Sequence, residues 1–239
     1  MKTETIEYSH GGIALEGYAA HGGAGQGRRP GILVLPAWHG IDAYARKRAE
    51  MIAELGYVAF VADIYGKGVR PKERAEAARE AGKYRADRPL LRARAAAGLD
   101  ALRTLPGVDA ARLAAIGYCF GGQGALELVR SGADLLGVVS FHGALDTPTP
   151  EDARTIRARV LVLHGADDPH VPTDAVQAFQ REMREGGVDW QMVLYGGAVH
   201  SFTDWNAGDD NAKGAAYNAK ADSRSWVAMR DFFDEMFSP

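Results

Sequence analysis

The sequence contains a single cysteine, Cys119, among its 239 residues. One cysteine cannot form a disulfide within the chain, so folding does not require an oxidising compartment. No apolar run approaches the roughly 18 residues that a membrane-spanning helix needs. The first seven residues lack the apolar core of a signal peptide. The formal net charge is only -3, which gives no general reason to expect nucleic acid or an anionic membrane as a partner. We therefore expect a cytoplasmic protein with neither kind of partner.

The composition is that of an ordinary globular protein, with 46% hydrophobic and 25% charged residues. A chain of 239 residues can form one large α/β domain or two small ones. Because there is no internal repeat and no long linker, we predict one α/β domain over residues 1–239. We expect a monomer or a weak homodimer.

Short apolar runs alternate with helical patterns along most of the chain, which predicts βαβ units and a mostly parallel sheet. Two segments near the N-terminus flank a Ser-His-Gly-Gly turn and predict an antiparallel hairpin. The arginine-rich helices are expected to have solvated faces, and the glycine-rich loop 21–30 is expected to be exposed together with His10 and His21. The predicted strands are 3–8, 13–20, 31–36, 57–62, 113–117, 136–141, 160–163 and 190–195, and the predicted helices are 43–55, 71–88, 90–105, 123–130, 173–185 and 222–237.

The segment 113–122, LAAIGYCFGG, places Cys119 between an apolar run and a helical pattern. Gly117 and the pair 121–122 complete a G-x-C-x-G-G pattern, a nucleophile elbow with cysteine in place of the commoner serine. We expect a strained backbone at Cys119, an exposed sulfur, and glycines where a Cβ would collide with neighbouring backbone. The N–H of Phe120 and the start of the helix would face the sulfur and favour negative charge on it.

A lone cysteine is more often a small buried core residue than a reactive one. The flanking glycines and the switch from strand to helix favour reactivity, so we predict that Cys119 is a nucleophile. A thiol is only a few per cent thiolate near neutral pH, so it needs a base. That base in turn needs a carboxylate to orient it.

Candidates for both roles follow the later strands, at whose carboxyl ends the chemistry of parallel sheets gathers. His200 follows the last predicted strand through a glycine-rich turn and is the predicted base. Asp167 and Asp168 compete for the acid role; the spacing to the following Val-Pro pair favours Asp168, and Asp167 is expected to cap the turn. The chain order nucleophile, acid, histidine is that of α/β-hydrolases. His142 and His164 also end strands and are expected to line the floor of the site.

These segments together resemble the dienelactone hydrolase family, and the resemblance extends over nearly the whole chain from Ile6. The matching segments are the elbow 117–122, the acid loop 165–172, the His-Ser-Phe sequence 200–202, Ala-Asp-Ile-Tyr-Gly at 62–66 and Ala-Tyr-Asn-Ala at 216–219.

The resemblance implies an α/β-hydrolase fold, in which a mostly parallel central sheet carries helices on both faces and an N-terminal antiparallel hairpin. It implies no metal or organic cofactor. It also implies that a Cys119–His200–Asp168 triad hydrolyses small esters or lactones through an acyl-thioester.

Two positions depart from the family's pattern. Members typically carry a glutamate that touches the cysteine and helps to activate it, and Ala37 stands at that position. Members that cleave dienelactone place an arginine after the His-Ser-Phe sequence, where this chain has Asp204. Because a carboxylate would repel an anionic dienelactone, we expect neutral esters or lactones to be the better substrates.

The loop after the strand 31–36 is expected to complete the site. The backbone N–H groups of Trp38 and Phe120 are the expected oxyanion hole. The indole of Trp38 could wall an apolar pocket or wedge between a helix and the sheet, and His39 could replace the missing glutamate or line the pocket. The expected pocket residues are Ala37, His39, Tyr118, Phe202 and Asp204.

Two further functions fit the same residues. One is a thioesterase or carboxylesterase for larger apolar acyl groups. The other is a non-catalytic protein whose cysteine senses oxidants.

Overall fold

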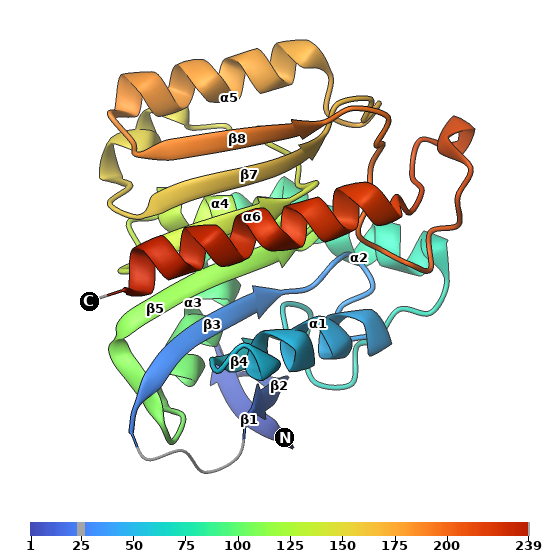
Figure 1. Cartoon of the computed structure of the whole chain (residues 1–239). Coiled ribbons are helices and arrows are strands. Elements are labelled where there is room, and N and C mark those ends of the chain that lie inside the picture. The colour runs from blue at the N-terminus through green and yellow to red at the C-terminus, as the bar shows by residue number, and fades with distance from the viewer. Residues whose placement is uncertain (23–26, 239) are drawn as a thin grey trace. The chain divides into compact units, whose positions relative to one another are not determined.

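The structure, a computed structural model, describes residues 1–22 and 27–238 (Figure 1). The chain divides into two compact units, residues 1–116 and 117–239. The expectation of a single domain over 1–239 stays a prediction.

The first unit contains a sheet in the strand order β1-β2-β4-β3-β5. β1 and β2 form the predicted antiparallel hairpin, and β2 also pairs antiparallel with β4. β3 and β4 are parallel, with Gly31 opposite Val58, as predicted for a βαβ unit. The bounds are β1 Lys2–His10, β2 Ile13–His21, β3 Arg29–Leu35, β4 Val58–Val61 and β5 Val108–Tyr118.

Helices cover both faces of these strands, with α1 on one side and α3 on the other (Figure 1). α1 (Ala43–Glu54) begins at Asp42, whose carboxylate accepts the N–H of Ala45 at 2.8 Å. Its buried residues recur every three or four positions, which is the spacing of one helix face. α2 is Arg74–Ala86 and α3 is Arg88–Thr104.

The prediction that the arginine-rich helices have solvated faces is wrong for two residues. Arg88 and Arg94 of α3 are buried, and Arg94 donates a hydrogen bond to the carbonyl of His10 at 3.3 Å. These helices are rich in alanine, so the long aliphatic stems of arginine occupy volume that small side chains leave open.

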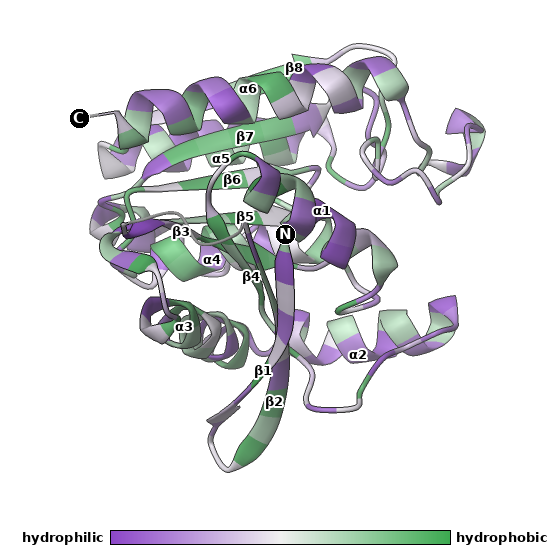
Figure 2. Ribbon diagram, turned by 60° about the horizontal axis from the view of Figure 1, so that its bottom comes forward, coloured by the Kyte–Doolittle hydropathy of each residue, from purple (hydrophilic) through white to green (hydrophobic). Residues whose placement is uncertain are grey.

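The second unit contains the parallel strands β6, β7 and β8, with Val138 opposite Val160 and Val160 opposite Trp190. α4 packs on β6, and α6 packs on β6 and β7; Figure 1 places α4 behind these strands and α6 in front. β7 is largely green in Figure 2 because its residues are apolar and almost all buried. The bounds are β6 Gly137–Phe141, β7 Arg159–Gly165, β8 Trp190–Tyr195, α4 Phe120–Arg130, α5 Thr173–Gly186, α6 Ala219–Phe237, with short 3₁₀ helices at Pro150–Thr155 and Asn211–Lys213.

A fully buried arginine ties α4 to α5. Arg130 donates two hydrogen bonds of 2.7 Å to Glu182 and one of 3.0 Å to Glu127. Burial raises the pKa of Glu182, and the charge and hydrogen bonds of Arg130 oppose that rise. Such a pair holds the helix that begins at the elbow in a defined position.

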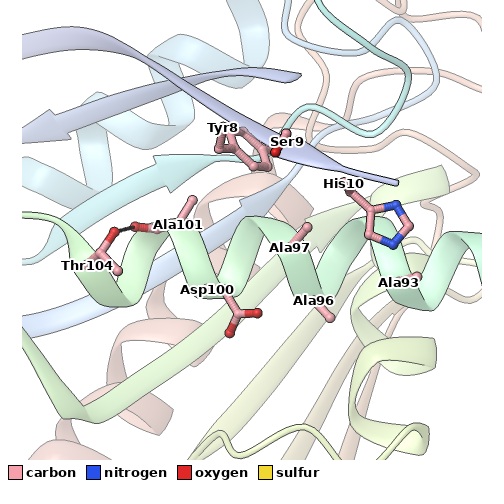
Figure 3. Close-up of a pocket in the computed structure, with 9 residues that line it drawn as sticks. All are labelled: Tyr8, Ser9, His10, Ala93, Ala96, Ala97, Asp100, Ala101 and Thr104. Carbon is pink, nitrogen blue, oxygen red and sulfur yellow. Dashed lines mark hydrogen bonds between the residues drawn. The ribbon is translucent and has the colours of Figure 1, made fainter. Parts of the chain in front are cut away.

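A pocket of about 530 Å³ lies in the first unit between the end of β1 and α3 (Figure 3). Four alanines of α3 form much of its wall, so the helix approaches the hairpin closely there. His10, expected to be exposed, lines this pocket and is half-buried, as is His21 at the end of β2. The lining residues are Tyr8, Ser9, His10, Ala93, Ala96, Ala97, Asp100, Ala101 and Thr104.

The predicted element order is confirmed, whereas several bounds differ. The strand predicted at 113–117 extends over Val108–Tyr118, the helix predicted at 123–130 begins at Phe120, and the helix predicted at 71–88 begins only at Arg74. The ends of the predicted loop 21–30 belong to β2 and β3, and residues 23–26 lie outside the described residues. No helix within residues 1–22 and 27–238 is long and apolar enough to cross a membrane.

Candidate active site

Cys119 is the single residue between the last residue of β5 and the first residue of α4. Its backbone has φ 53° and ψ −114°, a left-handed conformation that L-residues rarely adopt. Over the described part of the chain, only Cys119, His142 and Ser201 combine a side chain with a positive φ. Each costs on the order of 1–3 kcal/mol, and such strain collects at functional sites.

The glycines around Cys119 allow the strand and the helix to meet. A Cβ on Gly117 would lie 1.9 Å from the carbonyl oxygen of Gly121, and a Cβ on Gly122 would lie 2.7 Å from the Oγ of Ser140. The predicted collision is therefore confirmed at Gly117, and the one predicted at Gly121 stays a prediction. The expectation of an exposed sulfur is wrong, because Cys119 is only 8% exposed and the imidazole of His200 packs against its sulfur.

Three side chains from separate parts of the second unit form a hydrogen-bonded row. The Nε2 of His200 lies 3.1 Å from the Sγ of Cys119, and its Nδ1 lies 2.8 Å from the Oδ2 of Asp168. Asp168 also accepts the N–H of His170 at 2.8 Å on its other oxygen, which fixes the plane of the carboxylate. A thiol, an imidazole and a carboxylate in this row can generate and hold a thiolate.

The neighbouring Asp167 points elsewhere. Its Oδ2 accepts the N–H of Gly197 at 3.0 Å, so this carboxylate ties the acid loop to the turn after β8. The structure therefore brings Asp168, and not Asp167, to His200.

The charges in the row depend on one another. Burial alone would lower the pKa of His200, but negative charge on Cys119 and hydrogen bonds to Asp168 and Cys119 raise it to about 10. Burial would raise the pKa of Asp168, yet the hydrogen bond and charge of His200 outweigh burial and lower it. The geometry thus favours an imidazolium between two anions.

Other histidine and aromatic side chains surround the imidazole of His200. The ring of buried His142 meets it edge-on at 5.4 Å between centroids, and the exposed ring of His170 meets it at 5.1 Å. Phe202 packs edge-on against His142 at 5.1 Å. His164 is buried in the strand that leads to Asp168, and burial lowers its pKa despite that nearby carboxylate.

The remaining predicted site residues of the second unit have defined surroundings. Tyr118 is buried and stacks on Phe141 with 4.7 Å between ring centroids. Phe120 is buried as the first residue of α4. The carboxylate of Asp204 is half-buried and accepts the backbone and side-chain N–H groups of Asn206 at 2.9 and 3.1 Å.

The predicted residues of the first unit form a cluster of their own after β3. Ala37, Trp38 and His39 are half-buried. The carbonyl of Trp38 accepts the hydroxyl of Tyr65 at 2.8 Å, and the guanidinium of Arg74 lies 5.5 Å from the indole centroid. The expected roles of these residues in an oxyanion hole and a pocket stay predictions.

Sequence reasoning missed two residues near the row, one bonded to His142 and the other to Asp168. Thr203 is fully buried and its Oγ1 lies 2.7 Å from the Nε2 of His142. His170 supplies the N–H to Asp168. Thr203 follows the His-Ser-Phe segment directly, but nothing in a single sequence indicates that a threonine there points inward. Within residues 1–22 and 27–238, no group of three or more His, Cys, Asp or Glu side chains is arranged to hold a metal ion.

The chain is similar in sequence and structure to several known proteins. A solved structure named m3DLH is 45% identical, with a TM-score of 0.95, and the match covers 99% of both chains. A dienelactone hydrolase-like promiscuous phosphotriesterase from metagenomic libraries is 40% identical, with a TM-score of 0.93 and the same coverage. A protein of Bradyrhizobium sp. named "Probable 2-oxo-3-(5-oxofuran-2-ylidene)propanoate lactonase" is 30% identical over 186 residues, 74% of each chain.

The strand order, the elbow and these structural matches define an α/β-hydrolase fold, as predicted. The sequence profile of the dienelactone hydrolase family matches residues 15–237, and the chain belongs to that family. It is therefore a hydrolase of the dienelactone hydrolase type.

The close approach at the elbow leads to a prediction about stability. Gly117→Ala should destabilise the protein by about 3 kcal/mol or more, because the new methyl group would overlap a backbone carbonyl that cannot move without shifting α4. Gly196→Ala is the matched control, since no atom lies within 4 Å of its Cβ position. Urea unfolding would compare the two; equal stabilities would contradict the packing described for the elbow.

The raised pKa of His200 leads to a prediction about thiol reactivity. The imidazole should stay protonated up to about pH 10, and its positive charge favours the thiolate form of Cys119. As the pH falls below 8, alkylation of Cys119 by iodoacetamide should therefore slow less steeply than that of a free thiol of pKa about 8.5, which slows about tenfold per pH unit. His200→Asn should restore the steep dependence. A steep dependence in the unmodified protein would show that no ion pair forms.

Proposed function

We propose that this protein hydrolyses small neutral esters or lactones with Cys119 as nucleophile, His200 as general base and Asp168 as the residue that orients the base. The observation that carries the proposal is the row of contacts from sulfur to imidazole to carboxylate, at 3.1 and 2.8 Å. The strained elbow supports it, because a core cysteine needs no left-handed backbone.

The reaction begins from the ion pair in which His200 already holds the thiol proton of Cys119. The thiolate attacks the carbonyl carbon, and the imidazolium gives its proton to the oxygen of the departing alcohol. The result is an acyl-thioester on Cys119. His200 then takes a proton from water, the resulting hydroxide attacks the thioester carbon, and the thiolate leaves as the carboxylic acid is released.

The negative oxygen of the tetrahedral intermediate needs fixed donors. We assign this role to the backbone N–H groups of Phe120 and Trp38. Phe120 N–H lies in the first turn of α4, where the helix dipole favours negative charge. Removal of one such donor costs roughly 3 kcal/mol of transition-state stabilisation in comparable sites.

The burial of the sulfur bears on the alternative of an oxidant sensor. Sensor cysteines are solvent-accessible thiolates, whereas Cys119 is 8% exposed. The geometry therefore favours turnover over sensing. A thioesterase or carboxylesterase for larger acyl groups would use the same three residues, and a panel of aryl esters with increasing acyl length separates the two substrate classes.

The nucleophile and the acid can be tested together. Stoichiometric labelling of Cys119 by iodoacetamide should abolish hydrolysis of an aryl ester, and Cys119→Ala should be folded and inactive. Asp168→Asn should lower kcat by about 10³-fold or more, because the imidazole would lose its working tautomer. Full activity of the labelled protein would exclude the thiol as nucleophile.

Asp167→Asn is the matched control for the acid. It removes a charge one residue away and leaves the contact with His200 intact, so kcat should fall less than threefold. If Asp167→Asn were the more damaging change, the orienting role would move to Asp167.

Substrate charge is the second part of the proposal. A bound carboxylate must be offset by a cation or several donors. Asp204 is itself a carboxylate and would repel a negatively charged substrate. We predict a higher kcat/KM for a neutral lactone than for an anionic dienelactone. Asp204→Arg should shift this ratio about tenfold toward the anion, the scale of one charged contact. If kcat/KM of the unmodified enzyme were tenfold higher for the anionic dienelactone than for the neutral lactone, the proposed role of Asp204 in substrate choice would be wrong.

Neutral phosphotriesters are a second candidate substrate class. A solved relative that is 40% identical over nearly the full chain is named a promiscuous phosphotriesterase. Such triesters share the absence of charge with neutral lactones, so a site with Asp204 would not repel them. An aryl dialkyl phosphate assayed beside an aryl ester tests this class, and loss of both activities in Cys119→Ala would assign them to one nucleophile.

A further inference from the structure

We propose that His142 is a positioning residue, a neutral imidazole that holds the elbow of Cys119 and the loop of His200 in register. This inference rests on the proposed function. His142 is 1% exposed and has a positive φ. Within the described ranges, the only other residues with a side chain and a positive φ are Cys119 in the elbow and Ser201 next to the base. The strain therefore marks three points of one site.

The hydrogen bonds of His142 determine its tautomer. The backbone N–H of Cys119 can only donate, and it lies 3.2 Å from Nδ1 of His142 while also donating to the carbonyl of Phe141 at 3.0 Å. Nδ1 must therefore be the acceptor, and the proton resides on Nε2. Nε2 then donates to the Oγ1 of Thr203 at 2.7 Å.

A second proton on His142 would direct an N–H at the N–H of Cys119. It would also add a cation 5.4 Å from the imidazole of His200, which is itself held as a cation. The contacts thus select the neutral form. This neutral side chain can support the ion pair of Cys119 and His200 without competing for its charges.

The ring of His142 connects the elbow that carries Cys119 with the segment that carries His200. One nitrogen contacts the backbone of the elbow, and the other contacts Thr203, three residues after His200. The ring edge also meets His200 and Phe202. A change at Thr203 should therefore alter the placement of His200 relative to the sulfur without touching either group.

The direct test is the protonation state of His142 by ¹H–¹⁵N NMR of protein labelled at histidine. The resonances of His142 are assigned by their disappearance in His142→Phe. At neutral pH we expect a proton on Nε2 and none on Nδ1. A proton on Nδ1, or on both nitrogens, would overturn the proposal.

The functional test uses Thr203→Val, which keeps the shape of the side chain and removes the acceptor. We expect kcat for an aryl ester to fall about tenfold with KM changed less than twofold, the effect of one lost hydrogen bond on a transition state. Thr203→Ser restores the hydroxyl and should recover most of kcat. A loss smaller than threefold in Thr203→Val, or no recovery in Thr203→Ser, would overturn the positioning role.

A failure of the proposed function would give a different result from a failure of the proposal for His142. If Cys119→Ala hydrolyses the ester as fast as the unmodified protein, Cys119 is not the nucleophile, whatever the tautomer of His142. The NMR measurement needs no turnover and decides the state of His142 by itself.

Discussion

The backbone at Cys119 must leave a strand and enter a helix within one residue, and the surrounding packing follows from that turn. The left-handed φ of 53° brings the start of α4 so close to β5 that only glycine fits at Gly117. The same approach leaves no room for a Cβ at Gly122 or Gly143, where β6 packs against α4. Two buried features stabilise the strained elbow: the hydrogen bonds between Arg130 of α4 and Glu182 of α5, and the apolar strand β6 beside α4.

The second constraint is charge in a buried place. A thiolate, an imidazolium and a carboxylate would each be costly to bury alone. In a row, each one lowers the cost of the next, and the raised pKa of His200 and the lowered pKa of Asp168 express this mutual support. The neutral ring of His142 lies beside the row and adds contacts without adding charge.

Family membership and the proposed substrate choice rest on different observations. Membership of the dienelactone hydrolase family rests on a match over residues 15–237. The proposed substrate choice rests on Ala37 and Asp204, two positions within that range at which we expect a departure from the family's pattern. A fold and a nucleophile can thus be shared while the groups that meet the substrate change.

The amino-acid sequence by itself determined the order of the elements, the elbow and the family, because glycine spacing and apolar periodicity are local properties. Only the tertiary structure decided that Asp168 and not Asp167 meets His200, since a two-residue turn can aim either carboxylate. It also decided that the sulfur is buried and that His142 reaches Thr203. These contacts join residues 81 and 61 positions apart, and no local pattern encodes a distance between side chains so far apart in the chain.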